Sequence, residues 1–198
     1  MDVLCLDLEG VLVPEVWQAV AEKTGVPGLL KTTRDIPVYD ELMQYRLGLL
    51  REHDIALSTI HAEIKALEPL PGAGNFLAWA RLRYQVVIVS DTFYEFGMPL
   101  MAKLGYPLLL CHQLEVENDR IVGYQIRQQD PKRRSVQALK SLNYRIYAVG
   151  DSFNDVSMLD EADVGIFFSA PENVTSQFPK FLTTQSYDEL QQALLSAG

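Results

Sequence analysis

The sequence predicts an α/β protein whose core is a doubly wound parallel sheet. Short apolar runs typical of buried strands span residues 3–8, 85–90, 107–111, 145–149 and 164–168. Helical patterns separate most of these runs, and strands that alternate with helices favour a parallel sheet covered on both faces. One long interval, residues 14–71, shows helical patterns only. The predicted architecture is a Rossmann-like sheet with a small helical cap inserted after the first strand.

Composition places the chain among globular proteins and argues against several classes of partner. Its 198 residues can bury a full core, and 48% of them are hydrophobic. The net charge of −9 argues against nucleic acid or an anionic membrane surface as the main partner. No apolar run approaches the roughly 20 residues of a membrane span, and Asp2 and Asp7 interrupt the start where a signal peptide is apolar. We expect a cytoplasmic monomer or homodimer that acts on a small molecule.

The first predicted strand ends in two acids. Residues 3–13 read VLCLDLEGVLV, so an unbroken apolar run reaches Asp7, with Glu9 and Gly10 soon after. If the strand continues through residue 9, its period-2 alternation places both carboxylates on one side. Buried acids are costly unless a cation, a proton or reaction chemistry requires them. This strand end is either an ordinary polar turn or the beginning of an active site.

The helical insert follows directly on that strand end. Its three helical patterns, broken at 25–28 and 32–35, lie near residues 14–24, 38–53 and 57–67. A Leu-Pro-Gly sequence then marks the return to the sheet. We therefore divide the chain into an α/β core, residues 1–13 plus 72–198, and a helical cap, residues 14–71, over the active end of the first strand.

Two smaller elements complete the prediction. Apolar alternation at 114–117 and 121–127 flanks an Asn-Asp-Arg sequence, which is typical of an antiparallel hairpin. A short strand near 180–183 precedes a final helix near 187–196.

Four polar clusters follow apolar strands or open a helix. They are Asp7 with Glu9, Ser90-Asp91-Thr92, Asp130-Pro131-Lys132, and the segment from Gly150 to Asp155. The carboxyl ends of parallel strands meet at one crevice of an open sheet. Taken singly, such clusters are often helix caps or solvated side chains. Their joint placement predicts one shared site.

The acids of these clusters suit a divalent cation. Asp7, Asp151 and Asp155 supply the oxygen ligands that Mg²⁺ prefers, and Mg²⁺ typically takes one or two carboxylates beside waters and a substrate phosphate. Three carboxylates on one ion would be unusual, so we expect Asp155 to support the metal site without contacting the ion directly.

The remaining groups suit phosphoryl transfer. Ser90 supplies a hydroxyl, the amide of Asp91 a second donor, and Lys132 a fixed positive charge. Asp7 would attack phosphorus and form an aspartyl-phosphate. Glu9 would protonate the leaving oxygen and then deprotonate the acceptor.

With these motifs, the chain resembles the haloacid-dehalogenase-like phosphatase superfamily over nearly its whole length. Asp7-x-Glu9 is similar to its first motif, Ser90 to its second, Lys132 to its third, and Gly150-Asp151-Ser-x-Asn154-Asp155 to its fourth. The resemblance implies Mg²⁺ as cofactor. The implied roles are Asp7, Glu9, Ser90 and Lys132 in catalysis, Asp7, Glu9 and Asp151 at the metal, and Ser90, Asp91, Lys132 and Asn154 at the substrate.

The position of the insert matches the cap of the phosphoserine phosphatase branch. In that branch a glutamate after the first strand and a cap arginine hold the amino-acid end of the substrate, and Glu15 and Arg46 stand at the matching spacings. The charges agree, because phosphoserine carries an ammonium and a carboxylate. The alternative is that Glu15 is an acid in a first helical turn and Arg46 a surface residue.

Glu9 departs from the superfamily's common Asp-x-Asp pattern. With Glu9 in place, the segment DLEGVLVPE looks most like the bifunctional phosphoserine phosphatase/homoserine phosphotransferase subgroup. The resemblance implies phosphoserine as substrate and homoserine as a second acceptor. The alternatives are a phosphatase for another small phosphomonoester, a phospho-acceptor signalling domain, and a catalytically silent binding module on this fold.

Overall fold

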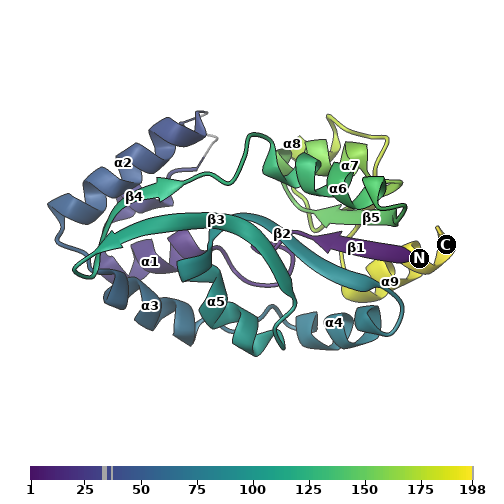
Figure 1. Ribbon diagram of the computed structural model, residues 1–198, viewed down its shortest axis with the longest axis horizontal. Coiled ribbons are helices and arrows are strands. Elements are labelled where there is room, and N and C mark those ends of the chain that lie inside the picture. The colour runs from purple at the N-terminus through teal and green to yellow at the C-terminus, as the bar shows by residue number, and fades with distance from the viewer. Residues whose placement is uncertain (33–34, 37, 198) are drawn as a thin grey trace.

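The computed structural model describes residues 1–32, 35–36 and 38–197, and it confirms the α/β fold. The described strands form one seven-stranded sheet in the order β4-β3-β2-β1-β5-β6-β7 (Figure 1). All neighbouring strands are parallel except β3 and β4. The chain adds β2 and β3 on one side of β1 and then crosses to β5 on the other side. Open α/β sheets bind their ligands at such a reversal, outside the carboxyl ends of the strands.

The strands are β1 (Asp2–Leu6), β2 (Gln85–Phe93), β3 (Leu108–Glu117), β4 (Arg120–Gln125), β5 (Arg145–Gly150), β6 (Val164–Phe168) and β7 (Leu182–Thr184). The α-helices are α1 (Val16–Thr24), α2 (Tyr39–Glu52), α3 (Leu57–Ala66), α4 (Ala73–Arg81), α5 (Tyr94–Lys103), α6 (Pro131–Ser141), α7 (Val156–Glu161), α8 (Glu172–Thr175) and α9 (Tyr187–Ser196). Two 3₁₀ turns are η1 (Pro27–Leu30) and η2 (Phe153–Asp155). Of the described helices, none is long and apolar enough to cross a membrane.

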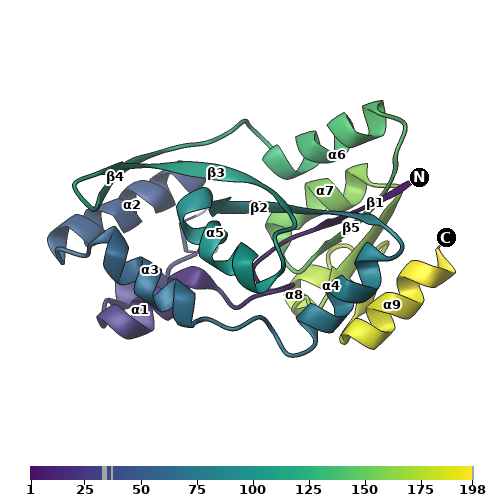
Figure 2. The ribbon, with the colours of Figure 1, turned by 60° about the horizontal axis from the view of Figure 1, so that its bottom comes forward.

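Alternate residues of β1 belong to two different hydrophobic clusters. Leu4 and Leu6 pack with the face that α4, α5 and α9 cover, whereas Val3 and Cys5 pack with the face that α6, α7 and α8 cover. Figure 2 shows α6 and α7 on one side of the strands and α4 and α9 on the other. The doubly wound arrangement that the sequence predicts is therefore confirmed, and it explains why β1 is apolar at every position after Asp2.

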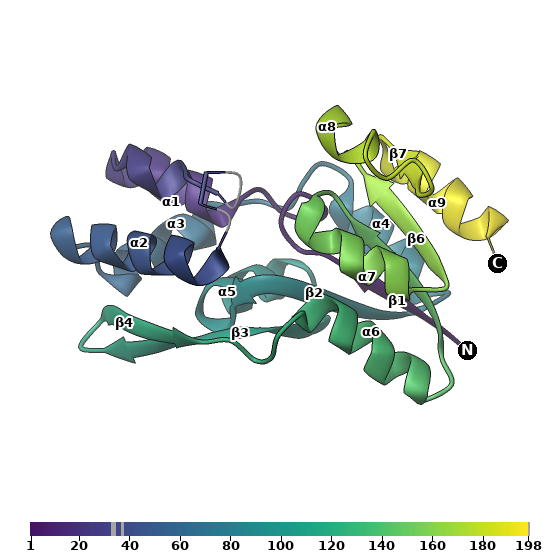
Figure 3. The ribbon, with the colours of Figure 1, turned by 90° about the horizontal axis from the view of Figure 1, so that it is seen from above.

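The helical insert after β1 is present as α1, η1, α2 and α3. Apolar residues of these elements join the cluster that includes α5, so the insert packs directly on one face of the core. Figure 3 shows α1, α2 and α3 gathered at one end of the molecule, opposite the chain termini. Residues 33 and 34, within the predicted break at 32–35, lie outside the described residues.

The predicted hairpin ties this insert to the sheet. The runs expected at 107–111 and 114–117 are one strand, β3, whose second half extends beyond β2 and pairs with β4. Asn118 and Asp119 have φ of +48° and +63°, as a two-residue type I′ turn requires. The Leu57 N–H donates to Asp119 O and the Ser58 N–H to Asp119 Oδ1, both at 2.9 Å. The turn therefore caps the start of α3.

The first strand is shorter than its apolar run suggests. β1 ends at Leu6, so Asp7 and Glu9 do not lie on one side of a continuing strand. Instead, the Leu12 N–H donates to Leu8 O at 2.8 Å, and further main-chain bonds close residues 8–13 into a tight loop. This loop, and not strand alternation, sets the direction of Glu9.

We expect the centre of the sheet to dominate stability. Leu4 is fully buried in β1, whereas Leu82 is 82% exposed. Leu4→Ala should lower the free energy of unfolding by about 2–5 kcal/mol because it leaves a cavity, and the control Leu82→Ala should change it by less than about 0.5 kcal/mol. Urea denaturation of both variants checks this, and equal losses would contradict it.

Candidate active site

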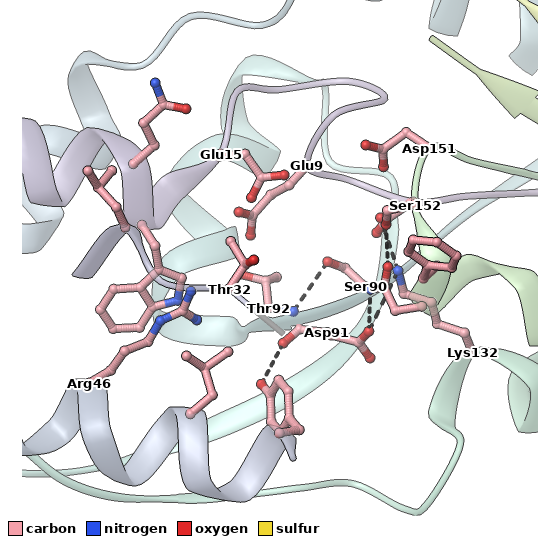
Figure 4. Close-up of a pocket in the computed structure, with 18 residues that line it drawn as sticks. Glu9, Glu15, Thr32, Arg46, Ser90, Asp91, Thr92, Lys132, Asp151 and Ser152 are labelled. Carbon is pink, nitrogen blue, oxygen red and sulfur yellow. Dashed lines mark hydrogen bonds and ion pairs between the residues drawn. The ribbon is translucent and has the colours of Figure 1, made fainter. Parts of the chain in front are cut away.

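The four polar clusters meet in one pocket of about 390 Å³ at the carboxyl ends of β1, β2 and β5. Figure 4 shows Lys132, Asp151 and Ser152 at one end of this pocket and Arg46 at the other, with Glu9 and Glu15 between them. All nine side chains that the sequence predicts for the site line it, namely Asp7, Glu9, Glu15, Arg46, Ser90, Asp91, Lys132, Asp151 and Asn154.

Asp7 lies where two loops come close together. Its side chain is buried, its N–H donates to Val149 O at 3.0 Å, and its Oδ1 accepts the Leu8 N–H at 2.8 Å. Gly10 has a φ of +77°, and a Cβ at this position would lie 2.5 Å from Asp151 Oδ2. A side chain at position 10 would therefore displace the Asp151 carboxylate and strain the backbone, and glycine avoids both.

Lys132 is the cation at the centre of the acidic end. Its Nζ lies 2.6 Å from Asp155 Oδ1, 3.0 Å from Asp7 Oδ2 and 3.7 Å from Asp91 Oδ2. Burial by itself lowers the pKa of Lys132, but the nearby carboxylates outweigh burial and hold that pKa well above its usual range. The ammonium group therefore stays charged and can neutralise an anion in the pocket.

Asp155 is fully buried, and both of its oxygens have partners. Oδ1 pairs with Lys132, while Oδ2 accepts the N–H groups of Asp151 and Ser152, each at 3.0 Å. The Ser152 hydroxyl adds a third bond to Oδ2 at 3.1 Å. Asp155 thus fixes the loop that carries Asp151 and, through its ion pair, the position of Lys132.

The acidic end fits the predicted cation. Asp7, Asp151 and Asp155 each have an oxygen within 4.8 Å of the others. Asp155 already has four partners on its two oxygens, whereas Asp7 has one on each, so Asp7 and Asp151 have more capacity to bind a cation. Burial, helped by the charge of Asp155, raises the pKa of Asp7 well above its usual range and that of Asp151 to about 7. A divalent cation would relieve this repulsion, and two carboxylates are what Mg²⁺ typically takes from a protein.

The Glu9 carboxylate lies apart from this acidic cluster. Its Oε2 accepts the Val16 N–H at 2.9 Å at the start of α1, beside Glu15. Burial, and next the charge of Glu15, raises the pKa of Glu9 to about 7, so it can gain or lose a proton near neutral pH. In this arrangement the predicted contribution of Glu9 to the metal would have to come from its main chain.

The Ser90–Thr92 segment lies where the register between β2 and β3 shifts. Ser90 Oγ accepts the Thr92 N–H at 3.2 Å, so the hydroxyl can still donate its own proton to a substrate oxygen. Asp91 accepts a hydrogen bond from Asn154 Nδ2 at 2.7 Å on its carboxylate. Two residues predicted to bind substrate are therefore bonded to each other across the pocket.

The insert contributes Tyr39 and Arg46 to the pocket, both from α2. The Tyr39 hydroxyl donates to Asp91 O at 3.0 Å, which ties the start of this helix to the end of β2. Arg46 is 7% exposed, and its Nη2 donates to Lys31 O at 2.7 Å. Its guanidinium carbon lies 4.6 Å from the centre of the Trp17 ring.

Arg46 also has an unsatisfied donor. Its buried Nε has no hydrogen-bond partner among the described residues. Burial lowers the pKa of Arg46 to about 10, so the group remains charged at neutral pH. A buried donor without a partner costs free energy unless a ligand satisfies it, and a carboxylate is the matching acceptor for a guanidinium.

The sequence indicates the charged residues of the pocket but not its aromatic ones, of which Trp17 and Tyr39 come from the insert. Each lies in the first turn of an insert helix. In a sequence, an aromatic residue at such a position indicates packing, and no spacing distinguishes a ring that contacts the core from one that lines a pocket. Their contacts with Arg46 and Asp91 are visible only in the folded chain.

A family model described as haloacid dehalogenase-like hydrolase matches residues 1–163. The chain belongs to this family. It is 58% identical over 199 residues to the phosphoserine phosphatase ThrH of Pseudomonas aeruginosa, covering 100% of this chain and 97% of that protein. It is also 58% identical to a phosphoserine phosphatase of Pseudomonas syringae pv. tomato, of which it covers 84%.

Solved structures of this haloacid dehalogenase-like type share the fold. A phosphoserine phosphatase in its apo form gives a TM-score of 0.80 at 22% identity, covering 98% of this chain and 97% of that one. A substrate-bound phosphoserine phosphatase complex gives 0.81 at 21% identity with the same coverage. The family that the four motifs predict is confirmed, and membership of a hydrolase family argues against the signalling-domain alternative.

The raised pKa values of the acidic cluster predict proton release on metal binding. Because Asp151 holds a proton below about pH 7, Mg²⁺ must displace it there. We expect the titration of Asp151 to raise the apparent affinity for Mg²⁺ roughly 20-fold between pH 5.5 and 7.5. Isothermal titration calorimetry in two buffers of different ionisation enthalpy measures the released protons.

Asp151→Asn is the matched variant for this experiment. It should weaken Mg²⁺ binding at every pH and reduce the number of protons released. An affinity of the native protein that does not change over this pH range would contradict the assignment.

Proposed function

We propose that this protein is a Mg²⁺-dependent phosphoserine phosphatase that works through an aspartyl-phosphate on Asp7 and also transfers the phosphoryl group to homoserine. One observation carries the proposal: a single pocket joins the acidic, lysine-containing end around Asp7 to the buried and partly unsatisfied Arg46. The names of the two relatives at 58% identity support phosphoserine as the substrate.

The first step uses Asp7 as the nucleophile. An Asp7 carboxylate oxygen attacks phosphorus, and the bond between phosphorus and the serine oxygen breaks. Lys132, 3.0 Å from Asp7 Oδ2, offsets the charge that collects on the phosphoryl oxygens. Ser90 donates its hydroxyl proton to one of those oxygens. Mg²⁺, held by Asp7 and Asp151, supplies further positive charge when it is bound.

Glu9 acts as the general acid of the first step and the general base of the second. With its pKa near 7, Glu9 can give a proton to the departing serine oxygen. The resulting carboxylate then takes a proton from the acceptor hydroxyl, whose oxygen attacks phosphorus and releases Asp7. The acceptor is water in hydrolysis and the homoserine hydroxyl in transfer.

The other end of the pocket would recognise the amino acid. Glu15 carries the charge to pair with an α-ammonium group, and Arg46 has a free Nε–H for an α-carboxylate. Both residues belong to the insert side of the pocket, whereas Asp7 and Lys132 belong to the core. A substrate that reaches both ends needs a phosphate, an ammonium and a carboxylate, which phosphoserine combines.

Homoserine would use the same two groups. It carries the same ammonium and carboxylate as serine, so Glu15 and Arg46 would orient it with its hydroxyl toward the phosphorylated Asp7. Positioning of this kind favours a bound hydroxyl over free water. The support for transfer is Glu9, the residue that distinguishes the bifunctional subgroup which the sequence resembles.

Asp7→Asn tests the nucleophile. We expect it to reduce phosphate release from phosphoserine by at least about a thousandfold, because the amide cannot form the covalent intermediate. The native protein should retain radiolabel from phosphoserine after acid quenching, in a form that hydroxylamine removes. Asp188→Asn, an exposed change of the same kind in α9, should leave both measurements unchanged. Labelling or turnover in Asp7→Asn would contradict the proposal.

Acceptor competition tests the transfer. With labelled phosphoserine and excess homoserine, we expect phosphohomoserine to form at the expense of inorganic phosphate. The amino alcohol 3-aminopropan-1-ol, which lacks the carboxylate, should accept little, and Glu15→Gln should reduce transfer to homoserine. Chromatography of the labelled products measures the partition. If inorganic phosphate is the single labelled product in the presence of homoserine, the protein is a phosphatase without transferase activity.

A further inference from the structure

Trp17 packs against Arg46, the guanidinium side chain of the pocket. Its ring lies under the Arg46 guanidinium, with 4.6 Å between the guanidinium carbon and the ring centre. The ring of Phe96 in α5 meets the Trp17 ring edge-on at 5.4 Å and 75°. Trp17 is 9% exposed and lines the same pocket as Arg46.

This stacking keeps the hydrogen-bond donors of Arg46 available. An acidic partner would hold the guanidinium by its N–H groups and neutralise its charge. An aromatic ring instead attracts the flat face of the cation and leaves the N–H edge free. The main-chain carbonyl of Lys31 takes one N–H of Nη2, and Nε remains without a partner among the described residues.

The stack also connects the two halves of the pocket. Arg46 belongs to α2, Trp17 to α1, and Phe96 to the helix that follows the Ser90–Thr92 segment of the core. Phe96 is buried and packs in turn on Phe93, at 5.8 Å and 86°. The indole therefore lies between the guanidinium and Phe96 of the core helix α5.

We propose that Trp17 is a specificity-determining positioning residue, which holds Arg46 at the distance where its free N–H edge meets the α-carboxylate of a short amino-acid phosphate. The inference rests on the proposed function, because it assigns the means by which the same pocket selects its substrate. Trp17 acts through Arg46 and takes no part in the phosphoryl step. It should therefore control substrate binding and not the chemistry at Asp7.

The test compares phosphoserine with phosphoethanolamine, which differs from it by the carboxylate alone. In Trp17→Leu, we expect kcat/KM for phosphoserine to fall about 5- to 30-fold, mostly through KM, because the loss of a partly desolvated cation–π contact frees the guanidinium. For phosphoethanolamine, kcat/KM should stay within about twofold of the native value, because no carboxylate is bound. Trp17→Phe keeps an aromatic face and should lose less.

Trp79→Leu is the matched control. Trp79 also lies beneath an arginine, with Arg83 4.7 Å from its ring centre, but it is outside the pocket. Its loss should leave the preference for phosphoserine unchanged. If Trp17→Leu lowers kcat/KM equally for both substrates, or changes neither, the inference is overturned while the proposed function stands. If the native protein does not prefer phosphoserine over phosphoethanolamine, the pocket does not recognise the carboxylate. Both proposals are then overturned together.

A second measurement needs no turnover. The chain has two tryptophans, so Trp79→Phe leaves Trp17 as the single one. We expect serine to change the fluorescence of Trp17 as its carboxylate engages Arg46, and ethanolamine at equal concentration to change it much less. Equal responses to both compounds, or no response to serine, would overturn the inference.

Discussion

The burial of the Lys132 ammonium group among carboxylates is the constraint on which the rest of this structure depends. Lys132 is 1% exposed and lies within 3.7 Å of three acids, which come from the ends of β1 and β2 and from η2, the turn that follows β5. Removing one partner from a buried ion pair typically costs about 3–5 kcal/mol. The strand ends are therefore held together by charge as well as by the sheet, and Asp7 cannot move away from Lys132 without losing that compensation.

The same concentration of charge prepares the site for its chemistry. Lys132 alone does not neutralise the acids of the pocket. Burial and the charge of Asp155 therefore raise the pKa values of Asp7 and Asp151. A protein that optimised stability alone would not place these groups together, so their presence indicates a cation and an anionic ligand. The close approach of the loops depends on Gly10, where any side chain would collide with Asp151. This arrangement of acids therefore lowers the stability of the fold in favour of the reactivity of the site.

The insert completes the pocket because hydrogen bonds fix it to the core, two of them at key positions. At the hairpin turn, Asp119 caps the start of α3, and at the pocket, Tyr39 bonds to the main chain of Asp91. These contacts place Arg46 at the opposite end of the pocket from Lys132, as Figure 4 shows. A ligand that reaches both ends would therefore carry an anionic group at each. The short amino-acid phosphate that we propose as substrate meets this requirement.

The fold class and the charged residues of the site could be predicted from the sequence, because buried parallel strands leave continuous apolar runs and their ends leave polar clusters. All nine predicted side chains line one pocket. The sequence could not determine the direction of Glu9, because β1 ends at Leu6 and a main-chain loop, with no side-chain pattern of its own, turns Glu9 toward α1. Nor could it identify Trp17, because a ring that packs and a ring that holds an arginine look alike in a sequence. The first feature depends on the main-chain hydrogen bonds of a short loop and the second on contacts between segments distant in the chain, and neither leaves a pattern in the order of the residues.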